Sequence, residues 1–433
     1  MENTTQLLNS IKLTENGDIA FNTTGNNLLD ILFMTEYYTN HPNEVKIGNS
    51  EREKLFSMFI RDPRYGLGRR DLGRQLMAMS GVDLKNVVKA GRYDDIFFFN
   101  EWMEFLAEEI RNGNELAKKW APRYSSKNLM LARDFAHFLG LNKQQYGKFV
   151  KAKTVERSLS SKNTGIIQFE HVPSLAMLKY YNRFSRGNDT AERFANYLAD
   201  VKAGHKDLKV STTTVYDIYR NRQTIDADLF FDKIEKIAVN CIPVIDSSGS
   251  MQNQNDSYGK AMAIGHYLAK CSTYAPNMVV SFSSYPRLME LDANYGLNYP
   301  GGESLSNYER EIRSMHTGDW SNTDFGAVMR LLGGLNKLPE YLVVLSDMEF
   351  DYGSKMSKDQ VQRLWKSNGY TTKIVWWNLN ERATTTPEID EEGNIFMSGY
   401  NPMLLKFLEA GFDGQKFLDK LLDEYEKAIS KVE

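Results

Sequence analysis

The stretch IAVNCIPVIDSSGSM, residues 237–251, marks a change in the pattern of the sequence. Its first part is a continuous β-branched and apolar run, which is typical of a strand buried on both faces of a parallel sheet. An Asp, Ser and Gly loop and a helical segment follow it. Further apolar strands, separated by helical segments, are predicted at residues 277–284, 341–347 and 371–380. Strands that alternate with helices predict a doubly wound parallel α/β sheet, which we assign to residues 237–433.

Residues 46–236, before this change, show a helical pattern. Apolar residues recur at the i, i+3, i+4 and i+7 spacing of amphipathic helices, interrupted by Asn, Ser, Gly and Pro. The unit lengths are irregular, and we predict a helical scaffold that is repeat-like in the manner of HEAT repeats. Residues 1–45 are polar and rich in Asn and Thr, and we interpret them as an N-terminal arm with one short helix. The sequence thus predicts a multidomain protein with a helical part followed by an α/β part.

The two predicted domains differ in charge. The chain of 433 residues holds 53 Lys and Arg against 56 Asp and Glu, a net charge of -3, which excludes a globally basic nucleic-acid-binding protein. Residues 51–222 nevertheless hold 31 basic and 20 acidic residues, a balance of +11. Residues 237–433 hold 18 basic and 26 acidic residues, a balance of -8. An asymmetry of this size predicts two domains with different partners.

Oxygen-bearing side chains follow the predicted strands. Asp246 ends the first strand, Ser248 and Ser250 alternate with it in the next loop, and Asp347 directly follows another strand. Thr323 lies in a third loop, SNTDFG. Carboxylates and hydroxyls are ligands for a hard divalent cation, and sites in open α/β sheets form at the carboxyl ends of strands. These five residues therefore predict a site for Mg²⁺, with Mn²⁺ or Ca²⁺ as alternatives.

The order Asp246-x-Ser248-x-Ser250, then Thr323, then Asp347 resembles the metal-ion-dependent adhesion site of von Willebrand factor type A domains. This resemblance implies a type A fold in which the cation keeps an open position for an acidic ligand. Two alternatives remain. One is a Ser-rich turn with an unrelated Thr and Asp. The other is a phosphotransferase with an Asp nucleophile, similar to haloacid dehalogenases, although Ser248 stands where that fold has a second Asp.

Several strings outside this loop support a second resemblance. They are RDPRYGLGRRD (61–71), VVKAGRYDDIFFF (87–99), LGLNKQQYGKF (139–149), VPSLAMLKYYNRFSR (172–186), KIVWWNLN (373–380) and MSGYNPMLL (397–405). Together they are similar to the helical module of the Ro autoantigen (TROVE) group, and closer to an uncharacterised family of viruses, plants and fungi that joins such a module to a type A domain. The resemblance implies RNA binding by a ring-like or curved helical scaffold. The helical part is shorter here than in Ro proteins.

Basic residues in the helical part offer contacts for phosphates. The candidates are Arg61, Arg64, Arg69, Arg70, Lys118, Lys119, Arg123, Lys127, Lys148, Lys151, Lys153, Arg157, Arg183 and Arg186. The alternative is that they form solvated helix faces on which Arg pairs with Asp. For Asp94 and Asp95, before the apolar IFFF run, helix capping is the favoured interpretation over acid-base catalysis.

The cysteine content and the hydropathy pattern bear on localisation. Cys241 and Cys271 are too few for a disulfide framework, so a reducing compartment is expected, with Cys241 as a small core residue. The first residues show no secretory signal, and no apolar run approaches the roughly 18 residues of a membrane span. We expect a cytoplasmic protein, in the host cytoplasm if it is viral, without a membrane partner.

These observations favour a binding protein over an enzyme, and no catalytic residue is assigned. The leading hypothesis is a Ro-like scaffold whose helical part binds single-stranded or structured RNA, or a ribonucleoprotein, and whose Mg²⁺ site captures an acidic ligand. The alternative is a protein–protein adaptor or assembly subunit, such as a viral structural subunit, in which the metal binds a partner's carboxylate. A metal-dependent phosphohydrolase is a weaker third hypothesis, and no small-molecule substrate is indicated.

Overall fold

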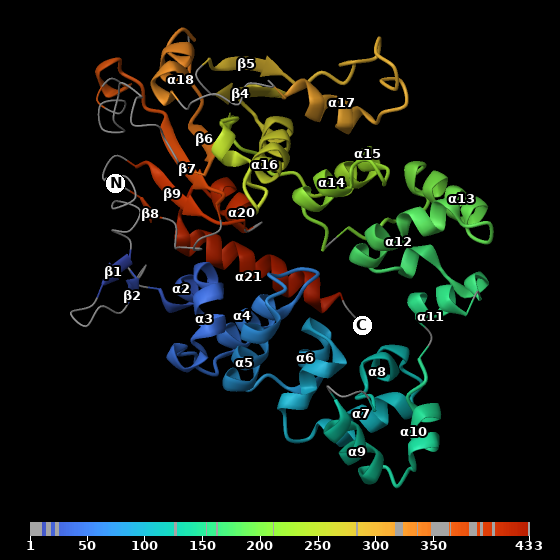
Figure 1. Ribbon diagram of the computed structural model, residues 1–433. Coiled ribbons are helices and arrows are strands. Elements are labelled where there is room, and N and C mark those ends of the chain that lie inside the picture. The colour runs from blue at the N-terminus through green and yellow to red at the C-terminus, as the bar shows by residue number, and fades with distance from the viewer. Residues whose placement is uncertain are drawn as a thin grey trace. The chain divides into compact units, whose positions relative to one another are not determined.

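The chain divides into two compact units (Figure 1). The first unit comprises residues 1–34 and 213–417, and the second comprises residues 35–212 and 418–433. The computed structural model describes residues 11–13, 19–21, 26–124, 128–152, 154–161, 163–210, 212–282, 285–316, 324–335, 337–347, 363, 365–380, 388–389, 393–400 and 403–431.

Among the described residues, the first unit contains a seven-stranded sheet with the order β5-β4-β3-β6-β7-β9-β8. The strands are β3 (Cys241–Asp246), β4 (Met278–Phe282), β5 (Arg287–Glu290), β6 (Tyr341–Ser346), β7 (Lys373–Asn378), β8 (Glu388–Ile389) and β9 (Ile395–Ser398). The inner strands β4, β3, β6, β7 and β9 run parallel, whereas β5 and β8 pair antiparallel at the two edges. The fold class predicted from the sequence, a helical part and a doubly wound α/β sheet, is confirmed.

Helices cover both faces of this sheet. Successive side chains of a strand point to opposite faces, so Val244 and Ile245 of β3 mark the two sides. Helix α18 (Phe325–Leu332) packs on the Val244 side, in a core that includes Trp376 of β7. Helix α16 (Ser257–Cys271) packs on the Ile245 side, where a Cβ at Gly265 would lie 2.4 Å from Ile245 Cδ1. Glycine at this position therefore allows the helix to approach the sheet closely.

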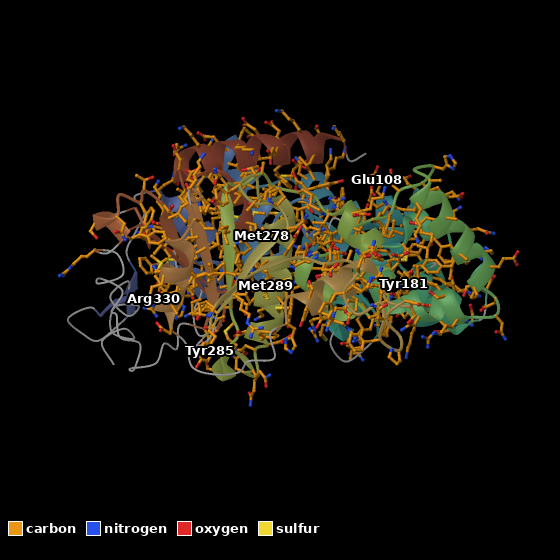
Figure 2. The ribbon with its side chains drawn as sticks, turned by 90° about the horizontal axis from the view of Figure 1, so that it is seen from above. Glu108, Tyr181, Met278, Tyr285, Met289 and Arg330 are labelled. Carbon is orange, nitrogen blue, oxygen red and sulfur yellow. The ribbon has the colours of Figure 1, made fainter. Side chains whose placement is uncertain are left out.

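The edge of the sheet at β4 and β5 is an antiparallel hairpin. Val279 of β4 pairs with Met289 of β5, and Met278 pairs with Glu290. Figure 2 labels Met278 and Met289 on these strands and Tyr285 near their connection, where 75% of the tyrosine is exposed. Cys241, the first residue of β3, is fully buried with a free thiol, as the sequence predicts.

The N-terminal helix α2 (Asn27–Phe33) belongs to the first unit, although the sequence suggested a separate arm over residues 1–45. Asn26 caps this helix by accepting from Leu28 N at 3.0 Å. The ring of Phe33 lies 5.1 Å from that of Phe407 in α20 (Met403–Glu409). Burial of these apolar side chains explains why the segment packs into a unit that is distant in sequence. Strands β1 (Ile11–Leu13) and β2 (Ile19–Phe21) form an antiparallel pair before it.

The boundary between the units also differs from the predicted boundary at residues 236 and 237. Helices α14 (Val215–Asn221) and α15 (Ala227–Lys233) fall in the first unit with the sheet. An ion pair contributes to this packing, because Arg222 after α14 pairs with Glu309 of α17 (Asn307–Ser314) at 2.6 Å. A pattern of amphipathic helices indicates that they pack, and long-range contacts decide against which partner.

The second unit is helical, as predicted. Its α-helices are α3 (Thr35–Asn40), α4 (Glu51–Arg61), α5 (Arg70–Ser80), α6 (Leu84–Ala90), α7 (Trp102–Arg111), α8 (Glu115–Trp120), α9 (Leu129–Phe138), α10 (Lys143–Phe149), α11 (Val155–Ser160), α12 (Ser174–Arg186), α13 (Ala191–Lys202) and most of α21 (Gly414–Ser430). Short 3-10 helices η2 (Pro42–Glu44), η3 (Tyr93–Phe98), η4 (Thr164–Ile166) and η5 (Phe169–His171) connect them. Capping boxes begin α4 at Ser50 and α10 at Asn142.

Aromatic side chains hold these helices together. The ring of Phe135 in α9 lies 5.2 Å from that of Trp102 in α7 and 6.0 Å from that of Tyr146 in α10. Farther along the chain, the Phe169 ring lies 5.0 Å from that of Phe194 in α13. The last part of α21, which the sequence pattern grouped with the sheet, joins this unit because Tyr425 packs edge-on against Phe59 of α4.

Candidate functional site

Two of the predicted metal ligands, Asp246 and Asp347, lie at the carboxyl edge of the sheet. Asp246 is the last residue of β3, and Asp347 directly follows β6. These two strands are hydrogen-bonded neighbours in register, with Ile245 opposite Leu345. The chain leaves β3 for β4 on one side and places β6 on the other, so the strand order reverses between them. Open α/β sheets bind ligands at this switch point.

Asp246 is fully buried and its carboxylate is held by neutral donors. Ser346 Oγ donates to one carboxylate oxygen at 2.6 Å, and the backbone N–H of Ser248 donates to the other at 2.9 Å. Burial raises the pKa of Asp246 to about 6, the hydrogen bonds from Ser346 and Ser248 oppose this shift, and the nearby charge of Asp347 adds to it. The donors that stabilise the Asp246 carboxylate are therefore neutral. A bound cation would stabilise this carboxylate further.

The hydroxyl groups of Ser248 and Ser250 lie beside this carboxylate, with their oxygens 3.1 Å apart. Adjacent ligands of an octahedral Mg²⁺, each about 2.1 Å from the ion, are separated by about 3 Å. The pair of hydroxyls therefore fits two neighbouring positions around one such ion. The backbone N–H of Asp347 contacts Met251 Sδ at 3.1 Å, which ties the loop after β6 to the loop after β3.

A second layer of polar contacts fixes the loop that carries the serines. Asn253 donates to Ser257 Oγ at 2.9 Å, and Ser257 Oγ donates to the carbonyl of Leu379 beyond β7 at 3.2 Å. Ser247 donates to the carbonyl of Phe282 at 3.1 Å. Sequence reasoning did not single out Ser346, Asn253 or Ser257. Ser346 could have been found, because it is a polar residue at the end of an apolar strand.

Thr323, the remaining predicted ligand, lies outside the described residues. Asp324 accepts from the backbone N–H of Ala327 at 3.1 Å and thereby caps α18. Within the described part of the chain, no group of three or more His, Cys, Asp or Glu side chains could hold a metal ion. The candidate centre differs from such a group, because the hydroxyls of Ser248 and Ser250 supply part of its donor set.

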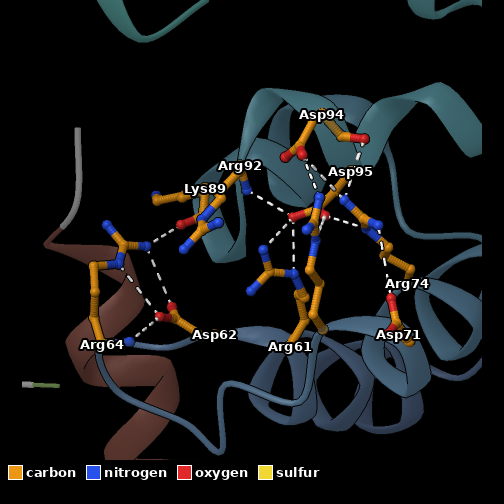
Figure 3. A network of polar contacts seen from close by, with 10 residues as sticks. Arg61, Asp62, Arg64, Asp71, Arg74, Lys89, Arg92, Asp94 and Asp95 are labelled. Carbon is orange, nitrogen blue, oxygen red and sulfur yellow. Dashed lines mark hydrogen bonds and ion pairs between the residues drawn. The ribbon is translucent and has the colours of Figure 1, made fainter. Parts of the chain in front are cut away.

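The basic residues of the second unit are divided between an internal network and the surface. Figure 3 shows the network, in which Arg61 and Arg74 converge on Asp95. Asp95 is fully buried and accepts from Arg61 Nε at 2.8 Å. Arg61 is 2% exposed, so its predicted role as a surface contact for phosphate is wrong. Arg70 pairs with Asp94 in the same network.

Two glycines make room for this network. A Cβ at Gly91 would lie 2.3 Å from a carboxylate oxygen of Asp95, and a Cβ at Gly73 would lie 2.6 Å from Arg61 Cα. Asp95 also accepts from the backbone N–H of Arg92 at 2.8 Å, at the start of η3. Neither aspartate is the N-cap, which is Arg92; Asp95 makes a capping contact from within η3 and combines it with ion pairing.

The other candidates for RNA contact differ in how far they are engaged. Ion pairs join Arg64 to Asp62 at 3.2 Å, Lys118 to Glu115 at 2.9 Å and Arg183 to Asp189 at 3.0 Å. Arg69, Lys119 and Arg123 are half-buried. Lys148, Lys151, Arg157 and Arg186 are exposed. Lys127 and Lys153 lie outside the described residues.

The described helices also bear on a membrane role. None of them combines the length and the apolar character that a bilayer crossing requires.

Two models of domain families match the chain. The model described as domain of unknown function DUF2828 matches residues 140–238, and the one described as domain of unknown function DUF7788 matches residues 240–431. The two matches meet close to the boundary that the sequence pattern predicts at residues 236 and 237.

Relatives and solved structures extend over more of the chain. The chain is 22% identical over 499 residues to the uncharacterized protein L728 of Acanthamoeba polyphaga mimivirus. The match covers 92% of this chain and 84% of that protein. The Ro (RSR) protein of Deinococcus radiodurans matches 94% of this chain and 96% of that chain, with 12% identity and a TM-score of 0.42. An aerotolerance-related membrane protein of Bacteroides fragilis matches 44% of this chain and all of that chain, with 16% identity and a TM-score of 0.22.

Proposed function

We propose that the first unit binds one divalent cation, Mg²⁺ or alternatively Mn²⁺ or Ca²⁺, and uses it to capture an acidic group of a ligand. The observation that carries this proposal is the fully buried carboxylate of Asp246, held by neutral donors beside the hydroxyls of Ser248 and Ser250. Asp347 directly follows the neighbouring strand β6, and Thr323 is assigned from the sequence motif. Both would bind directly or through water.

A buried carboxylate is unfavourable unless it is paired or coordinates a metal. Two buried carboxylates on adjacent strands increase the cost, since the charge of Asp347 contributes to the raised pKa of Asp246. A cation between them would offset it. Because neutral hydroxyls make up part of the donor set, the ion would keep much of its positive charge and attract an external carboxylate or phosphate.

Calorimetric titration of the whole protein with Mg²⁺ tests the centre. Wild type should bind one ion, and Asp246→Ala should abolish binding without changing the fold. Ser250→Ala is a second variant that keeps the buried carboxylate and should weaken binding. Asp189→Ala, which removes an exposed carboxylate of the other unit, is the matched control. Unchanged Mg²⁺ affinity in both site variants would refute the assignment.

The proposal is for binding without turnover. Catalytic two-metal sites use several carboxylates to hold two ions, and this motif supplies two carboxylates for one ion. Incubation with Mg²⁺ and a panel of RNA, nucleotides and phosphoesters should therefore release no product. Product formation that disappears in Asp246→Ala would show an enzyme instead.

RNA binding by the second unit is the second candidate function. The observation that favours it is a set of exposed cations, Lys148, Lys151 and Arg157, on and between α10 and α11. No ion pair joins them to an acidic group among the described residues. Burial lowers the pKa of Arg123, and the charge of Arg157 lowers it further. Such a group of cations suits a phosphate backbone.

The salt dependence of RNA affinity tests this function. Each phosphate contact on single-stranded RNA contributes about -0.7 to the slope of log affinity against log salt. Replacing Lys148, Lys151 and Arg157 together with Gln should weaken binding and make the slope less negative by about 2. Lys206→Gln is the control, since Lys206 pairs with Asp200 at 3.0 Å. An unchanged slope in the triple variant would contradict this surface.

A further inference from the structure

The internal network of the second unit contains one arginine whose charge is not paired. Ion pairs join Arg61 and Arg74 to Asp95, Arg64 to Asp62 and Arg70 to Asp94. Arg92 contacts Asp95 through its backbone N–H, at 2.8 Å, as the dashed line in Figure 3 shows. Its guanidinium makes no ion pair with a carboxylate among the described residues. Among the described residues, these ion pairs join Asp62, Asp94 and Asp95 to other arginines and leave the Arg92 guanidinium outside them.

The Arg92 guanidinium is held in place by an aromatic ring instead. Its Cζ lies 4.5 Å from the ring centroid of Trp120, at the end of α8. Lys119 Nζ lies 5.6 Å from the same centroid, so two cations share one indole. Burial lowers the pKa of Arg92, and the charge of Arg61 lowers it further. The charges of Asp94 and Asp95 oppose this shift, but the pKa of Arg92 stays below its usual value.

We infer that Arg92 and Lys119, beside Trp120, form a binding site for a phosphate group. The inference rests on the proposed RNA function of the second unit, because we assign the phosphate to an RNA backbone. A planar guanidinium can donate two parallel hydrogen bonds to phosphate oxygens, and stacking on Trp120 pre-orients it for this contact. Both cations are half-buried, so water screens them less than it screens side chains such as Lys148.

This assignment replaces part of the set predicted from the sequence. Arg61 is buried, and the guanidinium of Arg70 is paired with Asp94. Neither guanidinium is therefore available to a phosphate in the way that the guanidinium of Arg92 is. Their role is to hold Asp94 and Asp95, and with them the start of η3, where Arg92 is attached. Arg92, which Tyr93 separates from Asp94 and Asp95, was not among the candidates named from the sequence.

Fluorescence anisotropy of a labelled oligouridylate tests the site on the full chain. Arg92→Gln should weaken RNA binding about tenfold or more, as loss of a charge-assisted contact does, and make the salt slope less negative by about 0.7. Arg92→Lys should retain the slope and part of the affinity. Lys119→Gln should also weaken binding, and it decides the question if Arg92→Gln does not fold. Arg52→Gln, at an exposed arginine paired with Asp419, should bind as wild type does.

A parallel titration with inorganic phosphate, followed by phosphorus NMR, separates the sources of the phosphate group. RNA binding that is lost in Arg92→Gln supports the site on an RNA backbone. RNA binding that is unchanged in Arg92→Gln and Lys119→Gln overturns the site and leaves the proposed function standing. Absence of RNA binding in wild type removes the RNA function. In that case, phosphate binding that requires Arg92 preserves the site for a free phosphate, and its absence overturns the site as well.

Discussion

Replacing Asp95 with Ala removes the centre of the ion-pair network in the second unit. Asp95 is fully buried and accepts from Arg61 Nε at 2.8 Å, from the Arg92 N–H at 2.8 Å and from Arg74 Nε. Alanine leaves Arg61, which is 2% exposed, without a carboxylate, whereas Arg74 keeps a contact with Asp94 at 3.4 Å. Removing one partner of a buried ion pair costs about 3–5 kcal/mol, and we expect a loss in this range.

Urea denaturation followed by circular dichroism and tryptophan fluorescence measures the loss. With a denaturant slope of about 2 kcal/mol/M, the midpoint should fall by about 1.5–2.5 M. Asp189→Ala is the control, because its ion pair with Arg183 is exposed and exposed pairs contribute little. If Asp95→Ala unfolds at the same urea concentration as Asp189→Ala, the structural role of the network is refuted.

Three further predictions concern the first unit. Gly265→Val should lower thermal stability by about 1–3 kcal/mol through overpacking against Ile245, whereas Gly147→Ala, with open space around it, should not. Burial lowers the pKa of His266, so the unfolded state takes up more protons below about pH 6.5 and stability should fall there; thermal melts of His266→Gln should show a smaller acid loss. Asp324→Ala should cost about 1 kcal/mol in the same melts, and no loss would contradict its capping role.

Much of the first unit could be predicted because its signals are local. The β-branched run before Asp246 encodes a strand buried on both faces, and the alternation of strands with helices encodes a parallel sheet. Parallel strands bring their carboxyl ends to one edge, so the sequence alone was enough to place Asp246 and Asp347 near each other. Asp324 before an apolar helix was recognisable as a cap for the same local reason.

The network around Asp95 could not be predicted, because its partners are far apart in the sequence. Arg61 and Asp95 are 34 residues apart, and nothing in either segment indicates that α4 and η3 meet. The pattern of an amphipathic helix shows which face is buried and leaves its partner open. For that reason the sequence assigned Arg61 to a solvated surface. The same limit explains why α14 and the last part of α21 pack with units other than those with which the sequence pattern grouped them.

Anomalous X-ray diffraction from crystals soaked in Mn²⁺ shows whether a cation binds beside Asp246. Manganese accepts the same oxygen ligands as Mg²⁺ and gives a signal that locates the ion. Wild-type crystals should show one anomalous peak within coordination distance of the Asp246 carboxylate and the hydroxyls of Ser248 and Ser250, and crystals of Asp246→Ala should show none. A wild-type map with no peak at this edge of the sheet, or a peak that persists in Asp246→Ala, would contradict the account.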